Sequence, residues 1–251
     1  MKKYAIVTGT SRGIGTATAV ELLQRGWEVV GVARSGAPPE LDEVFYIHHR
    51  LDLGSLDAVD SWCDANLGRD ELSGYDRLGL VSNAAMIEPV GPVYSLPSRD
   101  LLSHLVVNVV VPTYMAGYLL GHAPPKTPLR VINLSSGAAT KAHSGWTAYC
   151  AGKAALNMTS EVLAVEVQTY PELLGRDVAV VTYSPNVVDT RMQEDLRAMD
   201  EVRFPAQQQF LDLNREGLLH HPSGPAREIA DLLECDGLPL YSEVRYQPPR
   251  S

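Results

Sequence analysis

Short apolar runs alternate with amphipathic stretches along most of the chain. The apolar runs have the length and the Val, Ile and Leu content of buried strands, and they lie at 4–8, 28–33, 45–53, 78–83, 130–134 and 178–183. The stretches between them carry apolar positions at helical spacing, at 14–25, 55–67, 100–120, 147–169 and near 225–234. This alternation predicts a single α/β domain over 1–251, built as a doubly wound parallel sheet of about seven strands with helices on both faces.

One segment breaks the rhythm. Residues 190–222 lie between the last predicted strand and the last predicted helix, and they are long and irregular, with Pro205 and the histidine pair 220–221 among them. A long insertion after the carboxyl end of a strand lies over the ligand crevice of such a sheet. We therefore expect 190–222 to form a substrate-binding lid within the domain.

A glycine-rich loop follows the first predicted strand, in the order Thr-Gly-Thr-Ser-Arg-Gly-Ile-Gly at 8–15. Glycines allow a tight turn and a close backbone approach, and the following helix start offers free N–H groups to a pyrophosphate. The spacing differs from the commonest dinucleotide fingerprint, and a purely structural turn is the alternative. Its place between a strand and a helix favours a Rossmann-type cofactor site contacted by Gly9, Ser11, Arg12, Gly13, Ile14 and Gly15.

The end of the second predicted strand indicates which dinucleotide binds. An acidic residue there would hydrogen-bond the ribose 2′-hydroxyl of NAD, but this strand ends in Arg34. Together with Arg12, it could pair with a 2′-phosphate, because guanidinium groups bind phosphate through two hydrogen bonds. The pattern favours NADP(H), with two ordinary surface arginines as the alternative.

A serine, a tyrosine and a lysine carry the candidate chemistry. Tyr149 and Lys153 are four residues apart on the predicted helix 147–169 and share one face, and Ser136 follows the fifth predicted strand. A nearby ammonium stabilises a phenolate, so we expect Lys153 to lower the pKa of Tyr149 by about two units towards neutral pH. Tyr149 would then exchange a proton with a carbonyl oxygen that Ser136 holds.

Taken together, these motifs resemble the short-chain dehydrogenase/reductase family over essentially the whole chain. The family's phosphate loop matches 8–15, and its active-site serine, tyrosine and lysine match Ser136, Tyr149 and Lys153. By resemblance, Asn108 helps to hold a water in a proton relay. The resemblance also implies cofactor contacts from Asp52, Leu53, Asn83, Ala84, Pro185, Val188 and Thr190, besides Tyr149 and Lys153.

Two glycines of the family pattern are replaced here, by Ala85 and Asn186. The segment 187–193 and the ending 240–246 are similar to the sepiapterin reductase and benzil reductase branch. Sepiapterin reductases anchor the pterin with an aspartate near the C-terminus, and Arg245 stands at that place. This difference disfavours a pterin and favours a 1,2-diketone such as benzil or another apolar carbonyl compound.

The resemblance therefore implies an NADPH-dependent carbonyl reductase that transfers hydride to a ketone. Candidate substrate contacts are Trp146, Asn186 and Met192. A sepiapterin-type pterin reductase and a 3-oxoacyl thioester reductase are alternatives within the enzyme class. A protein that senses NADP(H) without catalysis is the alternative outside it.

The composition and charge of the chain limit the kinds of partner that it is expected to bind. The 251 residues carry a formal charge of −9, which disfavours binding to nucleic acid. Uninterrupted apolar runs are too short for a membrane span. The three cysteines lack metal-ligand spacing, and the adjacent histidine pairs are poor joint ligands, so we expect no metal, reduced thiols and a cytoplasmic location. By resemblance, a homodimer or homotetramer forms through 100–120 and 147–169.

Overall fold

The computed structural model describes residues 1–41 and 44–248. Within them, seven strands form one sheet in the order β3-β2-β1-β4-β5-β6-β7, and every neighbouring pair is parallel. The strands are β1 (Lys3–Thr8), β2 (Trp27–Ala33), β3 (Tyr46–Arg50), β4 (Arg77–Ser82), β5 (Leu129–Leu134), β6 (Val178–Ser184) and β7 (Tyr241–Arg245). From β1 the chain winds first through β2 and β3 and then through β4 to β7, so the predicted doubly wound parallel sheet is confirmed.

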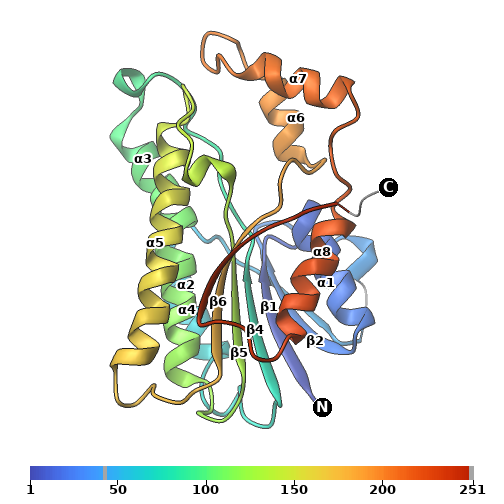
Figure 1. Cartoon of the computed structure of the whole chain (residues 1–251), viewed down its shortest axis with the longest axis vertical. Coiled ribbons are helices and arrows are strands. Elements are labelled where there is room, and N and C mark those ends of the chain that lie inside the picture. The colour runs from blue at the N-terminus through green and yellow to red at the C-terminus, as the bar shows by residue number, and fades with distance from the viewer. Residues whose placement is uncertain (42–43, 249–251) are drawn as a thin grey trace.

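Helices cover both faces of this sheet (Figure 1). They are α1 (Gly13–Gln24), α2 (Leu56–Asn66), α3 (Ser98–Leu105), α4 (Val111–His122), α5 (Thr147–Thr169), α6 (Arg191–Arg197), α7 (Gln207–Arg215) and α8 (Ser223–Glu234). Helices α2, α4 and α5 pack on one face, where Trp62, Met115 and Val167 join the strand residues of the larger core. Helices α1 and α8 pack on the other face through Leu22 and Leu233.

The predicted helix 100–120 is interrupted. Helix α3 passes into a π-helical turn at Val106–Val110, which continues into α4. Pro112 has no N–H to donate to the carbonyl of Asn108, and its ring would clash there in a regular α-helix, so the backbone widens at this point.

The combined helical stretch Ser98–His122 is long and apolar enough to cross a membrane by length and composition alone. However, 56% of its most apolar window is buried inside the fold, which is typical of a core helix.

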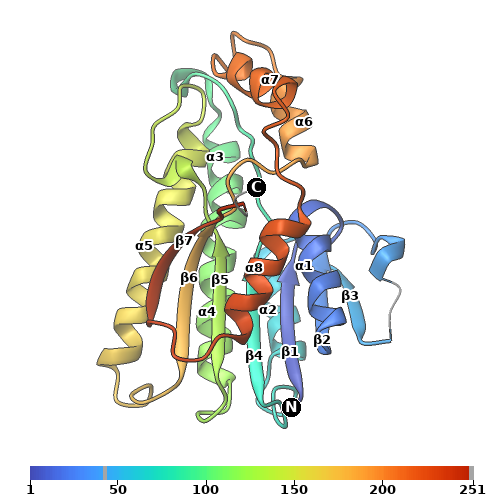
Figure 2. The same ribbon diagram turned by 45° about the vertical axis from the view of Figure 1, so that its right-hand side comes forward.

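Helices α6 and α7 stand beyond the carboxyl ends of the strands, within the segment 190–222 that the sequence marks as irregular (Figure 1). A bridge between Val188 and His220 closes the base of this segment. Strand β7 follows α8 and lies at the edge of the sheet beside β6 (Figure 2). It therefore brings the last described residues to the same end of the sheet as α6 and α7.

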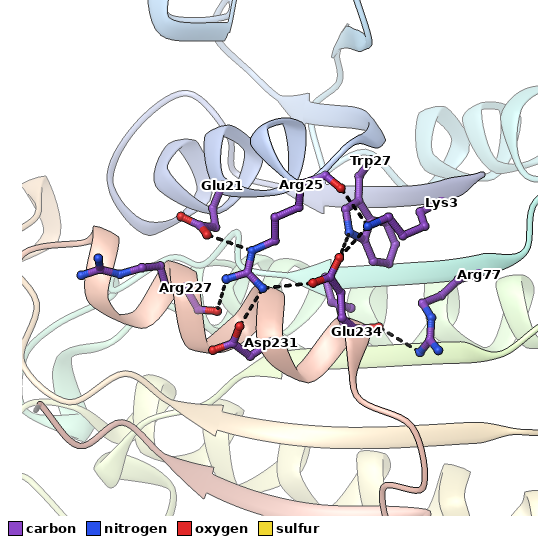
Figure 3. Close-up of polar contacts among 9 residues, drawn as sticks. Lys3, Glu21, Arg25, Trp27, Arg77, Arg227, Asp231 and Glu234 are labelled. Carbon is purple, nitrogen blue, oxygen red and sulfur yellow. Dashed lines mark hydrogen bonds and ion pairs between the residues drawn. The ribbon is translucent and has the colours of Figure 1, made fainter. Parts of the chain in front are cut away.

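An ion-pair network ties α8 to the rest of the fold (Figure 3). Glu234 at the end of α8 accepts hydrogen bonds from Lys3 Nζ at 2.6 Å and from Trp27 Nε1 at 3.1 Å. Arg25, after α1, donates to Glu21, Asp231 and Glu234. Because these contacts lie away from the carboxyl ends of the strands, we assign them to the stability of the fold.

Candidate active site

The glycine-rich loop is latched to the end of β4. Gly9 adopts a φ of 75°, and the side-chain amide of Asn83 donates to the carbonyl oxygens of Thr8 at 2.9 Å and Gly9 at 3.2 Å. In return, Thr8 Oγ1 accepts from the backbone N–H groups of Asn83 and Ala84, both at 3.0 Å. A Cβ on Gly9 would lie 2.7 Å from the Asn83 amide nitrogen, so only glycine fits this latch.

At the start of α1 the loop lies close to the segment after β6. Gly13 has a φ of 62°, and a Cβ there would lie 3.2 Å from Thr190 Cγ2. The loop and the segment after β6, both predicted to contact cofactor, therefore approach each other closely at this point. The glycine-rich loop and the N–H groups of the first turn of α1 form a cradle that fits the pyrophosphate of a dinucleotide. We call it the glycine cradle.

Side chains missed by the sequence analysis organise the other end of this cradle. The Tyr46 hydroxyl on β3 lies 2.9 Å from Thr10 Oγ1 and 2.8 Å from His48 Nδ1. His48 Nε2 lies 2.8 Å from the carbonyl oxygen of Ser35, the residue after Arg34. This hydrogen-bonded chain links the glycine-rich loop to the end of β2. A Cβ on Gly31 would overlap the Tyr46 hydroxyl, so the chain also depends on glycine there.

Arg12, Arg34, Asp52 and Leu53 are the residues expected near the adenosine of the cofactor. Arg12 and Arg34 are both exposed, and neither makes an ion pair with the residues that the structure describes. Asp52 accepts a hydrogen bond from the backbone of Gly54 at 3.0 Å, and Leu53 is buried in the core.

Ser136, Tyr149 and Lys153 come together at the carboxyl ends of the strands. Tyr149 and Lys153 project from α5 and are 7% and 3% exposed. Lys153 Nζ donates to the carbonyl oxygen of Leu134 at 2.6 Å, and it lies 5.7 Å from the centre of the Tyr149 ring. Ser136 Oγ accepts from the backbone N–H of Ala138 at 3.2 Å, which orients its hydroxyl at the end of β5.

The expected effect of Lys153 on Tyr149 is wrong for the protein by itself. Burial raises the pKa of Tyr149 to about 12, although the Ser136 hydroxyl opposes this shift. Burial also lowers the pKa of Lys153 to about 8. The ammonium is hydrogen-bonded to a backbone carbonyl rather than to the phenol, so the desolvation of both groups outweighs their mutual attraction.

Asn108 belongs to a buried cluster behind Tyr149. Its Nδ2 atom lies 2.8 Å from both the Met86 carbonyl oxygen and His104 Nε2, and its Oδ1 accepts from the Met86 N–H at 2.8 Å. His104 Nδ1 lies 2.7 Å from the carbonyl oxygen of Glu88, so the ring donates from Nδ1 and accepts at Nε2. Burial lowers the pKa of His104, which favours this neutral form. Both amide N–H groups of Asn108 are thus engaged, which leaves its oxygen or the π-helical backbone to contact a water.

The segment after β6 begins with Pro185 and a residue in the left-handed conformation. Asn186 has a φ of 60°, which explains why the related family pattern has glycine at this position. Its Nδ2 donates to the carbonyl oxygen of Tyr246 at 2.6 Å, and its Oδ1 accepts from Arg245 Nε at 2.8 Å. These bonds fix the segment that continues to Val188 and Thr190.

A cavity of about 620 Å³ opens between these groups and the segment 190–222. It is lined by Ser136 and Tyr149 from the body, by Met192 and Phe210 from the segment, and by Arg245. Trp146 lines it too and belongs to a buried cluster with Ile87, Val90, Ala138, Tyr149, Leu196, Phe204 and Phe210. The predicted substrate contacts Trp146, Asn186 and Met192 therefore all lie on this cavity.

The family model for short chain dehydrogenases matches residues 3–201. The chain belongs to the short-chain dehydrogenase family. It is 30% identical to a benzil reductase ((S)-benzoin forming) of Bacillus cereus, over 97% of this chain and 98% of that protein. It is 29% identical to the sepiapterin reductase of Xenopus tropicalis, over 92% and 91% of the two chains.

A solved short-chain dehydrogenase/reductase from Saccharomyces cerevisiae has the same fold, with a TM-score of 0.81 and 26% identity over 99% of this chain and 97% of that one. As a short-chain dehydrogenase, the chain is an oxidoreductase that acts on C=O and CH–OH groups of a small molecule. The fold implies a nicotinamide dinucleotide cofactor, and the glycine cradle described above fits one.

Proposed function

We propose that this short-chain dehydrogenase reduces an apolar ketone with NADPH, and that 1,2-diketones such as benzil are among its substrates. The observation that carries the proposal is the convergence of Ser136 and Tyr149 on one cavity beside the glycine cradle, with Lys153 buried next to the Tyr149 ring. The benzil reductases among its relatives and the apolar cluster around Trp146 support the choice of substrate.

Tyr149 is the proton donor in this proposal. Because its pKa is raised, the phenol stays protonated at neutral pH and can give its proton to the carbonyl oxygen. The Ser136 hydroxyl donates a hydrogen bond to the same oxygen. Lys153 places a positive charge behind the phenol, which stabilises the phenolate as it forms. Asn108 supports the π-helical turn from which a water would return the proton. When bound, the cofactor supplies the hydride.

We further propose that the cofactor is NADP(H) rather than NAD(H). Arg34 and Arg12 would hold the 2′-phosphate, and Asp52 and Leu53 would lie near the adenine. Gly9, Ser11, Gly13, Ile14 and Gly15 would contact the pyrophosphate, with Asn83, Ala84, Pro185, Val188 and Thr190 towards the nicotinamide. Arg34→Asp is expected to raise the KM for NADPH by about 100-fold while preserving use of NADH. An unchanged preference would exclude this role.

The segment 190–222 acts as a lid in this proposal. Helices α6 and α7 contribute Met192, Leu196 and Phe210 to the cavity wall. Movement of this segment would admit the substrate and then exclude water from the reacting carbonyl.

We also propose that the chain pairs with a second copy through α4 and α5, as a homodimer or as part of a homotetramer. In addition to the family resemblance, the support is a set of exposed apolar side chains on these helices, the π-helical turn before α4 and the end of α3: Leu105, Val110, Tyr114, Met158, Val162 and Val165. All three cysteines are free, which supports a reducing compartment such as the cytoplasm.

The test is consumption of NADPH with benzil, run beside NADH and beside sepiapterin. Rapid NADPH use with benzil, lost by about 10³-fold or more in Tyr149→Phe with cofactor binding retained, would support the proposal. Reduction of sepiapterin but not benzil would assign the chain to the pterin reaction that its other relatives carry out. Binding of NADPH without turnover on any carbonyl would indicate a nucleotide sensor.

A further inference from the structure

Arg245 is held at the rim of the proposed substrate cavity. It is the last residue of β7, and its Nε donates to Asn186 Oδ1 at 2.8 Å. The Asn186 amide is itself fixed by the 2.6 Å bond from its Nδ2 to the Tyr246 carbonyl oxygen. These two hydrogen bonds fix the Nε end of the guanidinium and leave its two terminal nitrogens for other partners.

Gly137 brings the guanidinium close to the reacting centre. A Cβ on Gly137 would lie 3.4 Å from Arg245 Nη2, so no side chain of this residue separates Arg245 from the loop that carries Ser136. Gly137 directly follows Ser136, which is proposed to hold the substrate carbonyl. A group bound by Arg245 would therefore lie near that carbonyl.

The charges around Arg245 leave it without a neutralising partner in the described part of the chain. No carboxylate there lies within 4.0 Å of its guanidinium. Glu243 also lines the cavity and accepts from the Tyr241 hydroxyl at 2.9 Å, but its carboxylate makes no ion pair with Arg245. The remaining titratable side chains on the wall, besides Tyr149, are Lys141 and His143, which add no negative charge.

Part of the cavity wall is apolar, although Gln193 and Gln209 of the segment 190–222 also line the cavity. Trp146, Met192, Leu196 and Phe210 line it, and the indole and phenyl rings belong to one buried cluster. The cavity therefore has an apolar wall that fits an aryl or alkyl group and a cationic rim beside Ser136. A neutral diketone would contact the apolar wall and leave the cationic rim without a counter-charge.

We propose that Arg245 binds a carboxylate of the carbonyl substrate, so that keto acids with an apolar body are preferred over neutral ketones of the same shape. The paired terminal nitrogens of arginine match the two oxygens of a carboxylate. This inference rests on the proposed reductase function and adds the charge of the substrate to it.

The test compares benzoylformate with its methyl ester, because the two share the reacting ketone and the phenyl group and differ in charge. We expect Arg245→Gln to lower kcat/KM for benzoylformate by at least 10-fold, mostly through KM. The ester should change by less than 3-fold. Arg245→Lys should restore part of the loss, since it keeps the charge but not the fork. Lys141→Gln, which removes another cation from the same cavity wall, should not reproduce this selective loss.

An equal effect of Arg245→Gln on both substrates would overturn the inference, as would the same selective loss in Lys141→Gln. Turnover of benzil and of the ester without turnover of benzoylformate would overturn it too, and would leave the proposed reductase function intact. If none of these carbonyl compounds is reduced, both proposals fall.

Discussion

The indole of Trp146 stacks almost parallel on the ring of Phe204, with the ring centres 4.9 Å apart and the planes inclined by 13°. Trp146 immediately precedes α5, three residues before Tyr149, whereas Phe204 belongs to the segment 190–222. Phe204 is fully buried, so this contact joins the helix that carries the proposed proton donor to the proposed lid.

Phe204→Ala should therefore loosen the lid. We expect the KM for an apolar ketone to rise by about 10-fold with a smaller change in kcat, because Trp146, which lines the cavity, loses its stacking partner while Tyr149 and Lys153 remain in place. Steady-state kinetics with benzil would measure this. Val202→Ala, at a residue of the same segment that is 82% exposed, is the matched control and should behave as wild type. Equal effects of the two substitutions would argue against a role of the stack.

Lys153→Met should stabilise the fold while abolishing turnover. Burial lowers the pKa of Lys153 from 10.5 to about 8, a difference worth about 3 kcal/mol in unfolding free energy. Methionine avoids this cost but leaves the Leu134 carbonyl oxygen without its donor, so we expect a net gain of about 2 kcal/mol at pH 7. Thermal unfolding should show a rise in Tm of about 5 °C.

The stability gain from Lys153→Met should depend on pH in one direction. Below pH 8 the lysine is protonated in both states, and the folded wild type bears the full cost of burial. Between about pH 8 and 10.5 the folded lysine is neutral while the unfolded one still binds a proton, so the wild type gains stability as the pH rises. The difference between the two proteins should shrink from pH 7 to pH 9.5. A constant difference would contradict the assignment.

Tyr46→Phe should weaken the binding of NADPH more than the binding of NADH. The hydroxyl bonds to Thr10 and His48 connect the glycine-rich loop to the segment that carries Arg34. Losing these bonds should raise the KM for NADPH by about 5-fold, which corresponds to the net free energy of one hydrogen bond. The KM for NADH should change by less than about 2-fold. Tyr75→Phe removes a hydroxyl that bonds Glu28, outside this chain, and serves as the control. An equal loss with both cofactors would show that Tyr46 stabilises the loop without discriminating between them.

Glu234→Ala should destabilise the protein without changing its turnover at 25 °C. The carboxylate accepts from Lys3, Arg25 and Trp27, so its removal takes one acceptor from each of these donors, although Lys3 and Arg25 keep other partners (Figure 3). We expect a loss of about 2 kcal/mol, measured by denaturant unfolding at pH 7. Glu216→Ala, on an exposed residue, should have no such effect.

The contribution of Glu234 should also vanish in acid. Although burial opposes it, hydrogen bonds from Lys3 and Trp27 hold the pKa of Glu234 below its ordinary value of 4.5. A carboxyl with a depressed pKa stabilises the fold above that ordinary value and loses the effect as the pH falls through its folded pKa. The difference between wild type and Glu234→Ala should therefore shrink below pH 4.5.

Local pattern is enough to predict β1 to β6 and several of the candidate site residues. The helix expected at 147–169 coincides with α5, and the strand expected at 178–183 differs from β6 by one residue. Both are long or strongly apolar, so their own side chains decide their structure. The glycine-rich loop and the spacing of Tyr149 and Lys153 are also local features, because neighbours in sequence set them.

Other features depend on partners far along the chain. Strand β7 is half exposed and short, and only its pairing with β6 makes it a strand. The helices α6 and α7 lie in a segment that the sequence marks only as irregular, and part of that segment packs on Trp146. The π-helical turn around Asn108 could have been predicted from Pro112. No sequence pattern predicts the hydrogen bond between Asn108 and His104 that orients the Asn108 amide.

The sequence by itself determined most of the strands and helices along the chain, the glycine-rich loop and the candidate reacting side chains, because each belongs to a recognisable local pattern. Only the tertiary structure decided the electrostatics of those side chains. Tyr149 and Lys153 are close enough to suggest mutual attraction. Burial nevertheless raises the pKa of Tyr149 and lowers the pKa of Lys153, and both shifts favour the neutral form. Desolvation depends on everything packed around a group, from α5 to the distant Phe204, and no local pattern contains that information.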